Sequence, residues 1–255
     1  MQAFTGIVTE NKGEHDNHPH RIAISLIDMF SGLLGFQAMS TSLYVRREQT
    51  VKQGRFIELS LMHGGAMLSG IRLIANYLEH GAAQRTSMPN GVFNTANGQI
   101  NITMVRPGDW KPFCASIDRM DLFEHPRYST HKARGDNLDE LLEIVRPVIK
   151  SRTTEWLSER LTEHGIMNGR VNSYEEFLKE EQVAATGIMA WLAQPGIAEL
   201  VPMPNIPGLP PLVSGSKRAH APRVGEHTRD VLSEHGYGDA DIAAMIAAKV
   251  VGVPA

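Results

Sequence analysis

Two long apolar segments near the start of the chain have the spacing of packed helices. They cover residues 22–45 and 62–78, and their apolar side chains recur three and four positions apart. Gly32 and Gly35 lie inside the first segment, where a glycine costs stability unless another backbone comes close. The pattern therefore predicts two helices, the first packed tightly on a neighbour, with residues 56–61 as a strand or an extended lead-in.

The pattern changes to alternation after about residue 90. Residues 92–95 and 99–105 flank Asn97-Gly98, a dipeptide typical of a type I′ hairpin turn, because both positions of that turn need a positive φ. The sequence therefore predicts a β-hairpin here, followed by helices.

Capping residues mark where these further helices begin and end. We expect Asp109 to cap a helix that enters at Trp110, and Thr153 to cap another. The remaining expected features are Asn137 with Glu140 before a helix at 138–149, a helix over 154–164 that Gly165 ends, a capping box of Ser173 with Glu176, and two short helices at 226–235 and 240–249, with Gly236 ending the first and Asp239 capping the second.

A proline-rich stretch divides the later part of the chain. Residues 195–222 hold seven of the 14 prolines, which predicts a linker or an extended strap and excludes a helix. We expect a mixed α/β chain, α+β as present here. Its predicted parts are residues 1–81 with the two long helices, a small α+β domain at 82–192, and a strap with C-terminal helices at 193–255.

Composition narrows the class of protein. The 255 residues carry 25 Lys and Arg against 28 Asp and Glu, so no basic surplus indicates nucleic acid or an anionic membrane. Cys114 is the only cysteine, which excludes an internal disulfide and favours a reducing compartment. No apolar run is long enough to span a bilayer, and the N-terminus lacks the pattern of a signal peptide. We therefore expect a soluble cytoplasmic protein.

Most catalytic motifs are absent from the sequence. It contains no Walker or Rossmann glycine loop, no CxxC or HExxH motif and no Gly-x-Ser-x-Gly elbow. A cluster of His15, Asp16, His18 and His20 has ligand types that suit zinc, and the alternative interpretation is a solvated loop. Cys114 is either a nucleophile or, as we expect, a buried structural thiol.

Three further sets of residues leave two interpretations open. Asp28 lies in apolar sequence, as an acid, base or nucleophile, or as a structural carboxylate that accepts backbone N–H groups or pairs with Arg21. For Asp28, the structural role is favoured. The three tryptophans are expected to be core anchors rather than stacking platforms. The densest basic group along the sequence is either a solvated helix end or a contact to an anionic ligand. These residues are Trp110, Trp156 and Trp191, and Arg46, Arg47, Lys52 and Arg55.

Five blocks of the sequence, in order, resemble one known family. They lie at residues 2–6 (QAFTG), 21–32, 46–61 (with QGRFIELSL), 152–172 (RTTEW, then GIMNGRVN) and 221–237 (APRVGEHT, then GY). They are similar to blocks of the class III, CaiB/BaiF-type CoA-transferases. That family includes formyl-CoA transferase, carnitine CoA-transferase and α-methylacyl-CoA racemase.

The resemblance implies a fold and a place for this chain within it. Family members form two interlocked subunits, each with a large Rossmann-like domain and a smaller domain. Residues 1–81 would be the rim of the large domain, 82–192 the small domain, and 193–255 the strap and tail that return to the large domain. Most of the N-terminal Rossmann-like domain would lie before Met1. Without that domain, the apolar faces of the two long helices would be exposed. We therefore expect the chain to associate, as a homo-oligomer or with an N-terminal half.

The resemblance also implies a reaction. Such transferases attack an acyl-CoA thioester with a carboxylate, which gives a mixed anhydride and then an enzyme-bound CoA thioester. The catalytic aspartate precedes the block that here begins at Gln2, so no catalytic residue is assigned within the chain. Residues 85–92 match a loop that covers the active site, and we expect Asn90 and Gly91 to be its substrate or CoA-loop residues. Coenzyme A would be part of the substrates, acyl-CoA and a carboxylate, with no tightly bound cofactor and no metal.

Three hypotheses follow. The chain is the C-terminal part of a class III CoA-transferase, an acyl-CoA racemase relative, or a non-catalytic dimerisation or scaffold partner of a full-length paralogue. The racemase branch uses an additional glutamate near the start of the small domain. Residues 105–110 hold Arg106 and no glutamate there, which counts against the racemase.

Overall fold

The structure is a computed structural model that describes residues 1–11, 18–81, 89–216 and 218–254. It divides into two compact units. The first holds residues 1–91, 102–151 and 159–167, and the second holds 92–101, 152–158 and 168–255. The division predicted from sequence, at 81 and 192, stays a prediction.

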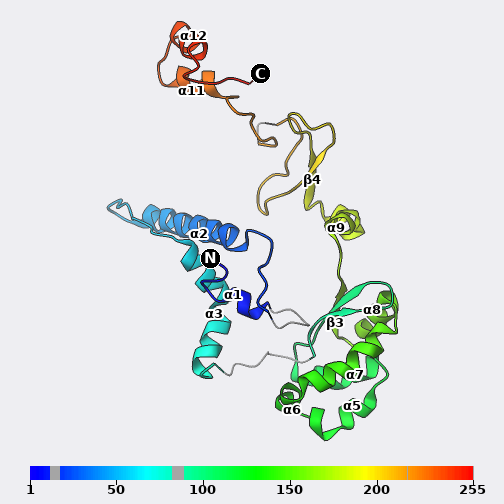
Figure 1. Cartoon of the computed structure of the whole chain (residues 1–255). Coiled ribbons are helices and arrows are strands. Elements are labelled where there is room, and N and C mark those ends of the chain that lie inside the picture. Colours follow the sequence, from blue (N-terminus) through cyan, green and yellow to red (C-terminus); the bar gives the residue numbers. More distant parts are fainter. Residues whose placement is uncertain (12–17, 82–88, 217, 255) are drawn as a thin grey trace. The chain divides into compact units, whose positions relative to one another are not determined.

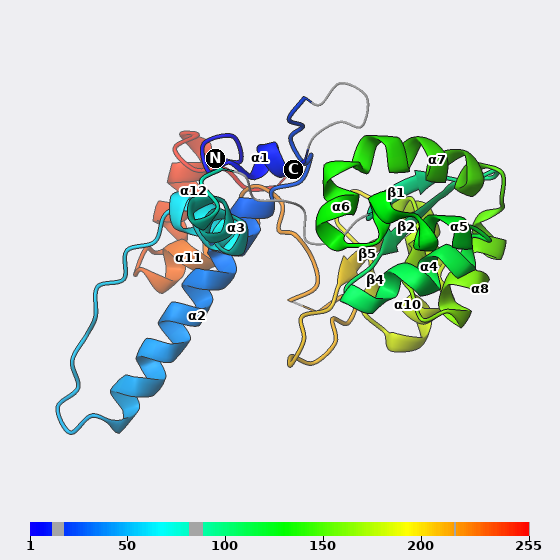
Figure 2. The same ribbon diagram turned by 90° about the horizontal axis from the view of Figure 1, so that it is seen from below.

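A short helix and two long helices open the first unit. They are α1 (Ile7–Glu10), α2 (Leu26–Glu48) and α3 (Leu61–Leu78), and α2 packs against α3 (Figures 1 and 2). Residues 56–60 form no strand, so the extended lead-in is the correct alternative there. The chain enters α3 through a capping box, in which the Ser60 side chain accepts from the His63 N–H and His63 Nδ1 accepts from the Ser60 N–H at 3.2 Å.

Glycines of α3, not of α2, make the close contacts here: Gly64 with α2, and Gly65 with the N-terminal segment. A Cβ on Gly64 would overlap the Ser31 hydroxyl, and one on Gly65 would lie 2.5 Å from Thr5 Cγ2. Gly32, in contrast, has open space around it, and a Cβ on Gly35 would meet only the Leu59 side chain, at 3.1 Å. The prediction of a tightly packed first helix is correct, but its glycines were assigned the wrong role.

The rest of the first unit is built from short helices (Figure 2). Because α7 places Leu141, Val145 and Ile149 at intervals of four, it buries one complete face. Phe113 and Leu161 are also fully enclosed. The helical segments here are η1 (Pro107–Asp109), α4 (Trp110–Ser116), α5 (Met120–Glu124), η2 (Pro126–Tyr128), α6 (His131–Asp136), α7 (Leu138–Lys150) and α8 (Thr154–Glu163), the last of which runs across the division between units.

A three-stranded sheet has the order β1-β2-β3, with β1 (Gly91–Asn94), β2 (Gln99–Thr103) and β3 (Met167–Arg170). The hairpin predicted around residues 97–98 is therefore present, but neither residue has a positive φ, so the turn is not type I′. Instead, Asn97 Oδ1 accepts from the Thr154 N–H at 2.8 Å, at the start of α8. A side chain expected to shape its own turn serves as a cap for a helix 57 residues further on.

The second unit continues with α9 (Tyr174–Lys179) and α10 (Glu181–Thr186), and an antiparallel pair of β4 (Met189–Leu192) and β5 (Val201–Pro204). The capping box of Ser173 and Glu176 is confirmed by both of its hydrogen bonds, at 2.8 and 3.2 Å. The proline-rich stretch holds no helix among its described residues, as predicted. Two helices, α11 (Thr228–Glu234) and α12 (Asp239–Ala247), follow it. Gly238, not Asp239, is the N-cap of α12.

No helix in the described part of the chain is both long enough and apolar enough to cross a bilayer.

Candidate functional site

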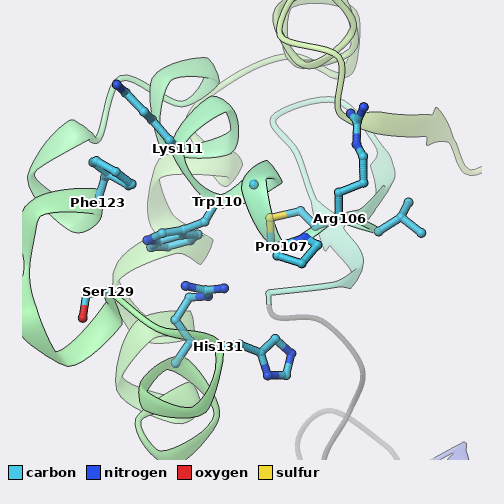
Figure 3. A pocket seen from close by; sticks show the side chains of 11 residues that line it. Arg106, Pro107, Trp110, Lys111, Phe123, Ser129 and His131 are labelled. Carbon is cyan, nitrogen blue, oxygen red and sulfur yellow. The ribbon is translucent and has the colours of Figure 1, made fainter.

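A pocket in the first unit is the strongest candidate site. It has a volume of about 380 Å³, and its lining comes from the end of β2, from η1, α4, α5 and α6, and from Ser129 (Figure 3). Figure 3 shows the Trp110 indole at its centre, with Lys111 and Phe123 on one side and His131 on another. Aromatic surface and charged side chains thus meet in one concave site, as they do in small-molecule sites generally.

Arg134 forms the buried part of this pocket. It is only 5% exposed, its guanidinium carbon lies 4.8 Å from the centre of the Trp110 ring, and Nη1 donates to the Tyr128 carbonyl at 3.0 Å. Burial lowers the pKa of Arg134. A guanidinium nevertheless stays charged in proteins, so a positive charge is held here against an aromatic face.

Asp109 fixes the backbone at the edge of the pocket. Its Oδ2 accepts from the N–H groups of Val105 and Arg106, each at 2.9 Å, and its Oδ1 accepts from Arg106 Nε at 2.9 Å. Burial opposes ionisation, but these donors and the charge of Arg106 together hold the pKa of Asp109 below its usual range. Asp109 was expected to cap α4 with its side chain. Asp109 does occupy the N-cap position of α4, but its side chain makes no capping bond, because its oxygens accept from the preceding turn.

The loop residues predicted from the family resemblance adjoin this pocket in the first unit. The Asn90 amide pairs with the backbone of Met104, which lines the pocket: Met104 N–H donates to Oδ1 at 2.7 Å, and Nδ2 donates to the Met104 carbonyl at 3.1 Å. Gly91 has a φ of 139°, a backbone conformation that residues with a side chain rarely adopt. Residues 82–88 lie outside the described residues, and the substrate role of Asn90 and Gly91 stays a prediction.

Several candidates from the sequence lie elsewhere. Cys114 is fully buried, and burial raises the pKa of its thiol to about 12, so it is a structural thiol as expected. Asp28 is exposed, which contradicts the predicted buried carboxylate. On the α2 face toward α3 the buried residues are Ile27 and Ser31, four positions apart, and Asp28 is turned away from that face.

The predicted basic group lies exposed at the end of α2 and just after it, and its role as a solvated helix end or as a contact to an anionic ligand stays open. Its residues Arg46, Arg47, Lys52 and Arg55 are exposed, and Lys52 Nζ donates to the carbonyls of Arg46 and Arg47 at 3.2 and 2.6 Å. Of the histidine cluster, His15 and Asp16 lie outside the described residues. Among the residues that the structure describes, no group of side chains could hold a metal ion.

Only one of the three tryptophans is the core anchor that we expected. Trp110 is 3% exposed. Trp156 is half-buried with Arg152 stacked on it at 4.7 Å, and Trp191 is 49% exposed, which contradicts its prediction.

Local geometry explains the residue types of the GEHT block in the second unit. Gly225 has a φ of 80°, and a Cβ there would lie 2.6 Å from the Gly252 carbonyl oxygen. Glu226 accepts from the Arg223 N–H at 2.9 Å and lies 2.7 Å from His220 Nε2. The backbone donor and then His220 hold the pKa of Glu226 below its usual value. The block therefore serves as a turn that fastens the C-terminal tail.

Comparison with known proteins adds a family to this geometry. A sequence model described as CoA-transferase family III matches residues 1–228. Succinyl-CoA:glutarate CoA-transferase of Mus musculus is 26% identical over 233 residues, which cover 87% of this chain and 52% of the relative. Succinate--glutarate CoA-transferase of Agrobacterium fabrum is 26% identical over 252 residues, which cover 92% of this chain and 59% of the relative. The chain thus spans between half and three-fifths of these relatives.

Solved structures support the fold. A CaiB/BaiF family protein from Brucella suis superposes with a TM-score of 0.67 at 20% identity, over 91% of this chain and 61% of that one. Rv3272 from M. tuberculosis, in an orthorhombic crystal form, gives a TM-score of 0.66 at 23% identity, with 81% and 55% covered.

Proposed function

Because the chain belongs to CoA-transferase family III, we propose that it forms part of an enzyme that moves coenzyme A from an acyl-CoA to a carboxylic acid. The observation that carries the proposal is the family match over residues 1–228, together with a fold shared with CaiB/BaiF proteins. The names of the mouse and Agrobacterium relatives make succinyl-CoA and glutarate the first substrates to test.

In this proposal the described residues position the substrate rather than attack it. The family resemblance places the carboxylate nucleophile before the block that starts at Gln2, so we assign no nucleophile within the 255 residues. Asn90 joins the chain just before β1 to the residue after β2 through its paired hydrogen bonds to Met104, and we propose that it positions the substrate there. We further propose that the chain works as an oligomer, with other copies or with a segment that supplies the nucleophile.

An exchange assay tests this function. The 255-residue polypeptide is incubated with succinyl-CoA and labelled glutarate, alone and after co-expression with the reading frame upstream of Met1. We expect label in glutaryl-CoA only from the co-expressed sample, because the carboxylate must form the mixed anhydride that releases the CoA thiolate. Hydroxylamine, which captures the anhydride as a hydroxamate, gives a second readout.

Two results would count against the proposal. Exchange by the polypeptide alone would show that a nucleophile lies within the described or neighbouring residues. Absence of exchange with every acyl-CoA and acid pair, in a co-expressed sample that copurifies as a complex, would remove the transferase assignment and favour a scaffold role.

A further inference from the structure

The pocket around Trp110 has an uneven distribution of charge. Arg106, Lys111, His131 and Arg134 all line it, and none of the described residues that line it is acidic. The Asp109 carboxylate accepts from two N–H groups of the preceding turn and from Arg106 Nε, which lines the pocket, at 2.9 Å. Asp109 therefore offsets the charge of Arg106, and Lys111 lies among described lining residues that include no carboxylate.

Two cations of this pocket lie against aromatic rings. Lys111 Nζ lies 5.5 Å from the centre of the Phe123 ring, and the Arg134 guanidinium carbon lies 4.8 Å from that of Trp110. Such stacking holds the charged groups in place without neutralising them. Lys111 is exposed, so its ammonium group is accessible to a ligand. The pocket thus places the exposed Lys111 ammonium beside the partly exposed Phe123 ring, with Arg134 and Trp110 forming its buried wall.

The Trp110 indole provides an independent observation. Its Nε1–H is buried and has no hydrogen-bond partner among the described residues. Buried polar atoms in proteins are nearly always hydrogen-bonded, so an unbonded donor in the wall of a pocket needs an explanation. An acceptor brought by a ligand would supply the missing bond.

We propose that this pocket is a binding site for a small organic anion, whose carboxylate or phosphate faces Lys111 and the Trp110 Nε1–H and whose apolar part lies against Phe123. Fixed cations select oxyanions over neutral molecules, and the aromatic surface selects organic anions over inorganic ones. This inference deepens the proposed function and rests on it for the choice of ligands, but binding at the site needs no nucleophile and no transfer step.

Binding to the 255-residue chain tests the proposal directly. The probes are glutarate as a carboxylate, coenzyme A as an organic phosphate, inorganic phosphate, and glutaramide as a neutral analogue of glutarate. Titration calorimetry measures affinity, and the indole N–H signal of Trp110 in NMR spectra reports occupancy of this pocket. Trp156→Phe and Trp191→Phe assign the other two indole signals.

We expect saturable binding of glutarate, of coenzyme A or of both, with a shift of the Trp110 signal, and no binding of glutaramide. Binding by the carboxylate alone or by the organic phosphate alone identifies the source of the anionic group. Lys111→Met removes one partly exposed charge, so it should weaken affinity about fivefold. Lys132→Met is the matched control, because Lys132 is also exposed but pairs with Asp136 and does not line the pocket.

Three outcomes would overturn the site. They are no shift of the Trp110 signal with any anion, equal binding of glutaramide and glutarate, and equal affinities of Lys111→Met and Lys132→Met. None of them bears on the exchange assay, which depends on the nucleophile supplied by co-expression. The two proposals can therefore fail separately.

Discussion

Asp109 shows at the scale of one residue how the turn before α4 is held. Its side chain is 6% exposed and accepts three hydrogen bonds, two of them from backbone N–H groups. The Asp109→Asn variant keeps the size of the side chain but loses its charge and one acceptor oxygen. Since hydrogen bonds to charged groups are the strong ones, we expect the free energy of unfolding at neutral pH to fall by about 2 kcal/mol. Urea denaturation measures this difference.

The pH dependence of that difference has a definite sign. The pKa of Asp109 is lowered in the folded chain, so its contribution is complete above the pKa of an unfolded aspartate and is lost as the pH falls through the folded value. The stabilities of wild type and Asp109→Asn should therefore converge in acid. Asp121→Asn is the control: Asp121 is 61% exposed and pairs with Arg119, so its loss should cost less than about 1 kcal/mol. Equal losses from the two variants would contradict this account.

At the scale of elements, the contact between α2 and α3 depends on a glycine. The Gly64→Ala change places a methyl group onto the Ser31 hydroxyl, and Ser31 is itself buried. Overpacking of this kind costs about 2 kcal/mol, because the Ser31 hydroxyl must rotate away and the Ser31 Cβ and the Ile27 carbonyl oxygen still lie only 3.3 and 3.4 Å from the new methyl group. We expect lower stability in urea denaturation and faster amide exchange in both helices.

Gly70 of the same helix is the matched control. Open space surrounds the position of its Cβ, so Gly70→Ala should raise stability by about 0.5–1 kcal/mol through the helix preference of alanine. The two substitutions are chemically identical and their expected effects have opposite signs. A gain in stability from Gly64→Ala would show that the helices are not in close contact there.

These elements also show what the sequence can predict. The Ser173–Glu176 capping box and the hairpin were found correctly, because each depends on residues within about ten positions of one another. Asp28, Gly32 and Asn97 were assigned wrongly or incompletely, because their surroundings come from distant segments. Asn97 bonds the backbone of Thr154, and the glycine that α2 requires lies on α3.

The candidate pocket could not have been predicted for the same reason. Lys111, His131 and Arg134 lie on two helices that the fold brings together around Trp110. The sequence showed Arg106 only as the residue that stands where the racemase branch would have a glutamate, not as part of a pocket. No spacing rule predicts that a residue of α4 lies near residues of α6, because the turns between the two helices determine how close they come.

At the scale of the whole molecule, α2 and α3 expose many large apolar side chains. Large side chains more than half exposed occur along both helices, and they include Met29, Leu33, Phe36, Leu43 and Tyr44 on α2 and Ile71, Ile74, Tyr77 and Leu78 on α3. Contiguous patches of this kind mark association surfaces. We therefore expect the purified 255-residue chain to have a mass by light scattering larger than that of one chain.

A substitution on this surface shows whether it causes the association. Phe36 is 66% exposed, and Phe36→Asp places a charge where association would bury it, so the measured mass should shift toward one chain. Thr41→Asp adds the same charge to an exposed position of the same helix without removing a large apolar side chain, and it should leave the mass nearly unchanged. A wild-type chain that is monodisperse at the mass of one copy would contradict the prediction. An equal effect of both substitutions would mean that net charge, rather than the apolar face of α2, controls the assembly.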